Sequence, residues 1–78
     1  MDKHSVDKEW IDERVMLIPL DENGVSGREL TGWLRGIEED GLMFSKQFYS
    51  DSLKRPMPER AKFWPWERVG NVAPLFED

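Results

Sequence analysis

Three adjacent acidic residues, Glu38, Glu39 and Asp40, are the first candidates for chemistry in this sequence. Hard cations such as Ca²⁺ are bound by several carboxylate oxygens, so a group of acids can form a divalent-ion site. Adjacent side chains in a turn, however, point in different directions, and no spaced loop pattern accompanies these three. We therefore interpret residues 38–40 as a solvated turn, and we expect no metal site.

The single histidine, His4, is the other candidate for a base or a ligand. General acid–base catalysis requires titratable groups that are positioned together in a pocket, and no Ser, Cys or carboxylate motif accompanies His4. The sequence contains no cysteine, which excludes disulfides and thiolate-bound zinc. We expect a non-catalytic protein without a cofactor, and we expect residues 1–4 to be disordered.

Residues 63–66 (Phe-Trp-Pro-Trp) could form an aromatic platform for a nucleic-acid base or a proline-rich peptide. In an extended chain, Trp64 and Trp66 share one face, while Phe63 and Pro65 lie on the other. One of these faces must pack in the core. The alternative interpretation is therefore core packing combined with a subunit contact, and the sequence leaves both open.

Residues 53–62 contain four basic side chains against one acidic side chain. They could form a basic rim that contacts phosphate, or a solvated loop. The net charge of the chain is −5, with eleven acids and five bases in residues 1–40, and five acids and six bases in residues 41–78. This overall acidity opposes non-specific binding of nucleic acid. The candidate interaction surface comprises Trp64, Trp66, Lys54, Arg55, Arg60, Lys62 and Arg68.

A length of 78 residues predicts a single domain over residues 1–78. Below roughly 80 residues a core rarely supplies more than about 3–5 kcal/mol, so a small domain often needs a disulfide, a metal or oligomerisation. Only oligomerisation remains available here. No apolar run approaches the roughly 20 residues of a membrane span and no secretory leader is recognisable, so we expect no membrane association and a cytoplasmic location.

Short apolar runs separated by turn residues predict five strands, at residues 14–20, 28–37, 42–48, 61–66 and 70–76. Gly32 and Gly36 lie inside the second run, where glycine is typical of a bulge or a bend. Pro19 and Pro74 predict an edge or a bulge near the ends of the first and last strands.

Two segments are predicted outside the strands. Residues 5–12 could form a short helix with Ser5 as its N-cap, since Val6 and Trp10 would then share one face; an extended lead-in is the alternative. Residues 49–60 lack periodicity and contain two prolines, so we interpret them as a loop.

This pattern resembles an SH3-like small barrel, and more closely the Sm-like family. Residues 31–37 (TGWLRGI) are similar to the second strand of that family, where a glycine permits a bend, and residues 41–44 to its third strand. Residues 63–72 are similar to the ending of divergent members, where a short turn leads to the last strand. The resemblance covers roughly residues 5–76. It implies a strongly bent five-stranded barrel over residues 14–76 with a short N-terminal helix.

The RNA-binding motifs of the Sm-like family are altered here. Members that bind RNA carry an Asp and an Asn in the loop between the second and third strands, whereas residues 38–41 read Glu-Glu-Asp-Gly. The family also places a basic residue beside a glycine after the fourth strand, but Val69 separates Arg68 from Gly70. The resemblance therefore implies the fold without implying the RNA site.

We expect an assembly or protein-interaction module that forms a homo-oligomer through its edge strands. The Sm-like family closes into rings by pairing the fourth strand with the fifth strand of a neighbour, and closure removes exposed edges. One alternative is an RNA-binding protein that uses the basic residues 54–62. A further alternative is an acidic accessory protein that masks a basic partner with residues 1–40.

Overall fold

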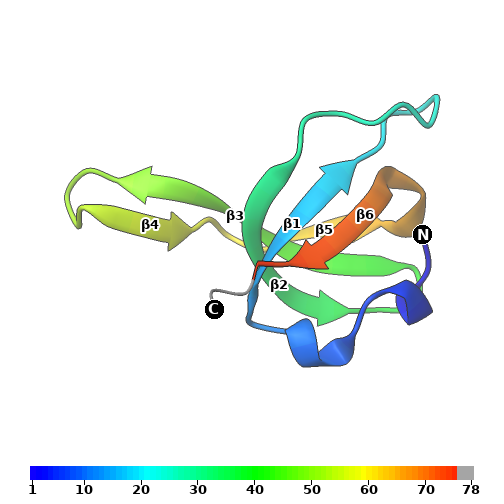
Figure 1. Ribbon diagram of the computed structural model, residues 1–78, viewed down its shortest axis with the longest axis horizontal. Coiled ribbons are helices and arrows are strands. Elements are labelled where there is room, and N and C mark those ends of the chain that lie inside the picture. Colours follow the sequence, from blue (N-terminus) through cyan, green and yellow to red (C-terminus); the bar gives the residue numbers. More distant parts are fainter. Residues whose placement is uncertain (76–78) are drawn as a thin grey trace.

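The computed structural model describes residues 1–75 as one bent antiparallel sheet of six strands (Figure 1). The strand order is β4-β3-β2-β1-β6, and β5 pairs with the first half of β3. The strands are β1 Arg14–Pro19, β2 Leu30–Ile37, β3 Gly41–Ser50, β4 Arg55–Pro58, β5 Lys62–Pro65 and β6 Val69–Pro74; the 3₁₀ turns are η1 Lys3–Ser5, η2 Lys8–Trp10 and η3 Trp66–Arg68. The mainly β prediction is confirmed.

The count of five strands was wrong by one, because residues 55–58 form β4 and not a loop. Two prolines argued against a strand here, but β4 borders the sheet and pairs with β3 on one side, where proline is tolerated. The sheet is open within residues 1–75, since β4, β5 and β6 each have one strand partner. Phe76, the predicted end of the last strand, lies outside the described residues.

The predicted helix over residues 5–12 is absent, and two 3₁₀ turns take its place. The Asp2 and Asp7 carboxylates accept backbone N–H groups of His4 and Glu9, each at 2.9 Å, so these acids cap the turns instead of Ser5. A two-turn helix is marginal in water, and Asp side chains offer the backbone competing hydrogen bonds. Within residues 1–75, none of the helical turns has the length and apolarity of a membrane-crossing helix.

The core contains residues of the sheet, of the η3 turn and of the N-terminal segment. Val6 is 5% exposed and Trp10 packs against the core, so these two residues hold the N-terminal segment on the sheet. The buried residues are Val6, Val15, Leu17, Leu34, Leu42, Phe44, Trp66, Val69 and Val72.

One extra residue in β2 changes which face its side chains occupy. Leu34 pairs with Phe44 and Gly36 with Met43, so Arg35 has no opposite residue. Beyond this bulge Ile37 pairs with Leu42 and packs against the core, although simple alternation places it on the other face from Leu34. The predicted irregularities at Gly36 and at Pro19 are both confirmed.

Candidate interaction surface

A two-stranded ribbon projects from the body of the sheet and reaches to the left in Figure 1. It consists of the second half of β3 and of β4, paired from Gln47–Pro58 to Ser50–Arg55, and we call residues 47–58 the arm. The pairing of β2 with β3 ends at Lys46, and β5 pairs only with Gly41–Phe44. Neither strand therefore covers the arm.

Arg14 ties the base of the arm to the body. Its guanidinium donates to the Gln47 side-chain oxygen at 2.6 Å and lies 5.7 Å from the centre of the Trp33 ring. Arg14 is in β1 and Gln47 is in β3, so this contact crosses the intervening strand β2. It fixes the direction in which the arm leaves the sheet.

Ser50 organises the turn at the tip of the arm. Its carbonyl oxygen accepts the Lys54 N–H at 2.7 Å, and its hydroxyl accepts the Leu53 N–H at 3.2 Å. Lys54 has φ 54°, in the left-handed region that costs a residue with a side chain about 1–2 kcal/mol. These bonds give the tip a defined shape, with Leu53 54% exposed.

Three large apolar side chains lie uncovered on the arm: Phe48 is 44% exposed, Tyr49 is 62% exposed and Leu53 is 54% exposed. Phe48 continues the alternation of Leu42 and Phe44 along β3, so alternation alone would place it on the same face as these two buried residues. The arm extends beyond the body, so no core lies beneath it there. Sequence reasoning missed these residues as surface candidates. The signal was an apolar run that continues into a segment rich in turn residues.

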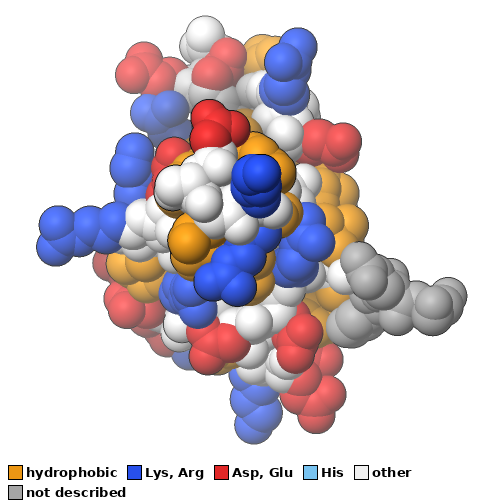
Figure 2. Space-filling view, turned by 90° about the vertical axis from the view of Figure 1, so that its left-hand side faces the viewer, with side chains coloured by type: hydrophobic (Ala, Val, Ile, Leu, Met, Phe, Trp, Pro, Cys, Tyr) orange, Lys and Arg blue, Asp and Glu red, His pale blue; other side chains and the backbone are white. Residues whose placement is uncertain are grey.

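Residues 46–62 are basic in an otherwise acidic chain. This stretch has five bases and two acids, a balance of +3, whereas the rest of the chain has six bases and fourteen acids, a balance of −8. The ion pairs among residues 1–75 involve Lys3, Arg35 and Arg68, so none of the five bases of the stretch pairs with a described residue. Figure 2 looks at the arm end-on and shows Lys, Arg and hydrophobic side chains in the foreground.

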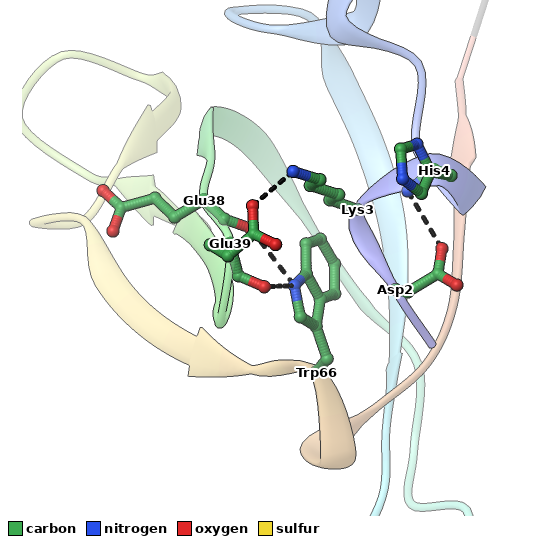
Figure 3. A network of polar contacts seen from close by, with 6 residues as sticks. All are labelled: Asp2, Lys3, His4, Glu38, Glu39 and Trp66. Atoms are coloured by element: carbon green, nitrogen blue, oxygen red, sulfur yellow. Dashed lines mark hydrogen bonds and ion pairs between the residues drawn. The ribbon is translucent and has the colours of Figure 1, made fainter.

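The structure separates the predicted aromatic platform from the basic residues. Trp66 is 7% exposed, and its indole N–H donates to the carbonyl oxygens of Glu38 at 3.2 Å and Glu39 at 3.0 Å (Figure 3). Trp64 is partly buried against the core. The interpretation as core packing therefore describes both tryptophans, and Phe63, 44% exposed, is the aromatic residue that faces outward.

The predicted basic residues divide into two groups. Lys54 and Arg55 are exposed at the arm tip, Arg60 is exposed in the connection from the arm to β5, and Lys62 is exposed at the start of β5. Arg68 lies elsewhere, in η3, and pairs with Glu22 in the β1–β2 loop at 3.6 Å. The structure thus brings four of the seven predicted site residues to the arm and its base.

The acidic turn at residues 38–40 holds the N-terminal segment. Lys3 forms an ion pair and hydrogen bond with Glu39, and this contact lowers the pKa of the Glu39 carboxyl (Figure 3). The His4 backbone N–H lowers the pKa of Asp2 in the same way. Among residues 1–75, no three His, Asp or Glu side chains converge as metal ligands would.

Prolines face outward on each strand that borders the described sheet. The N–H groups of Glu59, Trp66 and Leu75 donate inward to Lys46, Asp40 and Arg14 at 2.8, 3.2 and 2.9 Å. Each of these donors directly follows a proline, and successive N–H positions alternate between the two sides of a strand. Backbone nitrogens therefore face away from the sheet at Pro58, Pro65 and Pro74. The nitrogen of Pro56, two residues before Pro58, faces the same way. None of these nitrogens carries a hydrogen to donate.

Comparisons of this chain with known protein families, curated proteins and solved structures find no match. The features of the chain that bear on function are therefore the arm, its charge and the borders of the sheet.

Proposed function

We propose that this chain is a non-catalytic protein-interaction and assembly module that forms a homo-oligomer through its arm. The observation that carries the proposal is the exposure of Phe48, Tyr49 and Leu53 together on a ribbon outside the body. Exposed apolar groups bordered by polar residues mark interaction sites, and interfaces are enriched in aromatic and arginine side chains.

The proposed fold behind this function is a divergent small barrel of the SH3-like or Sm-like kind. Support comes from the strand order, from the pairing of β1 with β6, and from the single 3₁₀ turn that joins β5 to β6. Within that fold the arm is the hairpin formed between β3 and β4.

The contact is made by side chains more than by addition of a strand. Strand addition needs backbone donors on the outer edge, and outward prolines remove a donor from β4, β5 and β6. The arm offers apolar and charged side chains instead. We therefore propose the arm as the oligomer contact, in place of the edge pairing that the sequence suggested.

Native mass spectrometry over a range of protein concentrations tests the proposal. We expect the wild-type chain to assemble, and Phe48→Asp to remain monomeric because a charge replaces an apolar contact. Phe63→Asp is the matched control, since Phe63 is also 44% exposed but lies in β5. A wild-type monomer at every concentration, or assembly of Phe48→Asp equal to that of wild type, would overturn the proposal.

RNA binding is a second candidate, favoured by the basic side chains at the arm and its base, which form no ion pair with an acid among residues 1–75. Phosphate contacts by Lys and Arg give binding that weakens steeply with salt. Replacement of Lys54, Arg55, Arg60 and Lys62 by Ala is then expected to abolish binding of single-stranded RNA in a fluorescence anisotropy titration. Absence of binding by the wild-type chain at low salt rejects this candidate.

A further inference from the structure

A depression lies at the base of the loop that joins β1 to β2. Its volume is about 210 Å³, and it is lined by Pro19, Leu20, Asp21, Val25, Ser26 and Gly27. The Asp21 carboxylate accepts the N–H groups of Asn23 and Val25 at 2.8 and 2.9 Å, which gives the loop a defined shape. We call this depression the loop pocket.

Building on the proposed function, we infer that the loop pocket of one copy receives the arm tip of a second copy, with Leu53 as the inserted side chain. The sizes agree, because an apolar cavity of about 150 Å³ holds a benzene ring. Leu53 is 54% exposed on the arm, and Val25 is 61% exposed beside the pocket. Insertion covers both apolar groups at once.

The charges favour this pairing over contact between two arms. Residues 46–62 have a balance of +3, so two arms repel each other, whereas the remaining chain has a balance of −8. Around the pocket, residues 20–29 hold three acids and one base, and Arg68 pairs with Glu22 at 3.6 Å. Lys54 and Arg55 directly follow Leu53, so insertion brings two bases to this acidic loop.

The arm tip and the loop pocket lie on different sides of one copy. In Figure 1 the arm points to the left, while the β1–β2 loop points to the upper right. The arm tip therefore meets the pocket of another molecule and not its own. Such a contact is heterologous: successive copies join head to tail, and they form a ring if the rotation between them closes and a filament if it does not.

Complementation between two single variants tests this arrangement. Leu53→Asp disables the arm tip and keeps the pocket, while Val25→Asp disables the pocket and keeps the arm. We expect each variant alone to be monomeric in native mass spectrometry, and an equimolar mixture to give a 1:1 dimer and no larger species. Ile11→Asp, at a side chain 37% exposed and outside both surfaces, is the control and assembles like wild type.

The outcomes separate this inference from the proposed function. Both replaced side chains are more than half exposed, so the fold tolerates the changes, and circular dichroism verifies this. If Val25→Asp assembles like wild type while Leu53→Asp does not, or if the mixture stays monomeric, the arm contacts a different surface and only the present inference falls. If Leu53→Asp alone assembles like wild type, only the present inference falls; if wild type is monomeric, or if Phe48→Asp assembles like wild type, the proposed function falls with it.

Discussion

The rings of Phe44 and Trp64 meet edge to face, with their centres 6.4 Å apart and their planes at 88°. Phe44 is 1% exposed in β3, and Trp64 lies in the neighbouring strand β5. Edge-to-face pairs contribute about 0.5–1.5 kcal/mol beyond the area that they bury. This contact fixes β5 to the core by a side chain as well as by backbone pairing.

Replacement of Trp64 by Ala removes this contact and is expected to lower the free energy of unfolding by about 3 kcal/mol, as large-to-small changes at packed aromatic residues do. Urea unfolding followed by circular dichroism measures the change. Phe63→Ala is the matched control, because Phe63 is 44% exposed on the other face of the same strand, and its loss is expected to stay below about 1 kcal/mol. Equal losses in the two variants would contradict the assignment of Trp64 to the core.

Two glycines of β2 should respond differently to the same substitution. A Cβ atom at Gly32 would lie 2.7 Å from the Phe44 ring and closer still to the Ser45 carbonyl oxygen, whereas the nearest neighbours of a Cβ at Gly36 are 3.8 Å away. We expect Gly32→Ala to destabilise the fold by about 1–3 kcal/mol, as overpacking does, and Gly36→Ala to have little effect. Thermal unfolding of the two variants gives the comparison, and a larger loss for Gly36→Ala would refute it.

The outward prolines of β4 should keep the arm from pairing with other strands. Replacing Pro56 and Pro58 together by Thr supplies two outward N–H donors and a residue that favours strands. We expect the double variant to form β-rich aggregates, detected by thioflavin fluorescence and light scattering. Met57→Thr is the control, since the Met57 N–H lies on the side that faces β3. Comparable aggregation of the control would show that the donors are not responsible.

The ion pair between Lys3 and Glu39 makes a pH-dependent contribution. Because the folded pKa of Glu39 is lowered, the contribution is fully present above the ordinary carboxyl pKa and is lost as the pH falls through the folded value. Lys3→Ala is expected to return the pKa of Glu39 toward its ordinary value, as measured by NMR titration of the side-chain carboxyl carbon. Lys8→Ala, which removes a different base of the N-terminal segment, should leave the lowered pKa of Glu39 unchanged. A Glu39 titration that Lys3→Ala does not move would show that Lys3 is not its partner.

The central strands were predictable from the sequence, whereas the arm was not. The apolar runs of β1, β2 and β3 and the bulges at Pro19 and Gly36 follow from local residue patterns. The strand β4 was not predicted because its two prolines were taken to exclude a strand. Two prolines exclude a strand only when both of its sides must pair. The exposure of Phe48 depends on where the body ends, and that is set by the pairing of distant segments.

The residues of the candidate surface were predictable only in part. The basic residues near the arm were found because clustered charge is visible in the chain itself. Alternation put Trp64 and Trp66 on one face, but it could not say which face is buried. That was decided by contacts with Phe44 and with the carbonyl groups of residues 38 and 39, which lie twenty or more positions away.

The extra residue at Arg35 also constrains how this sequence can change during evolution. Ile37 reaches the core only because one residue of β2 has no opposite partner. Deletion of Arg35 would remove the bulge and leave Leu34 and Ile37 two positions apart, so that uninterrupted alternation would keep both on the core face. The constraint therefore falls on the apolar residue that pairs with Leu42, and homologous sequences can lack one residue in this stretch as long as they keep that apolar residue.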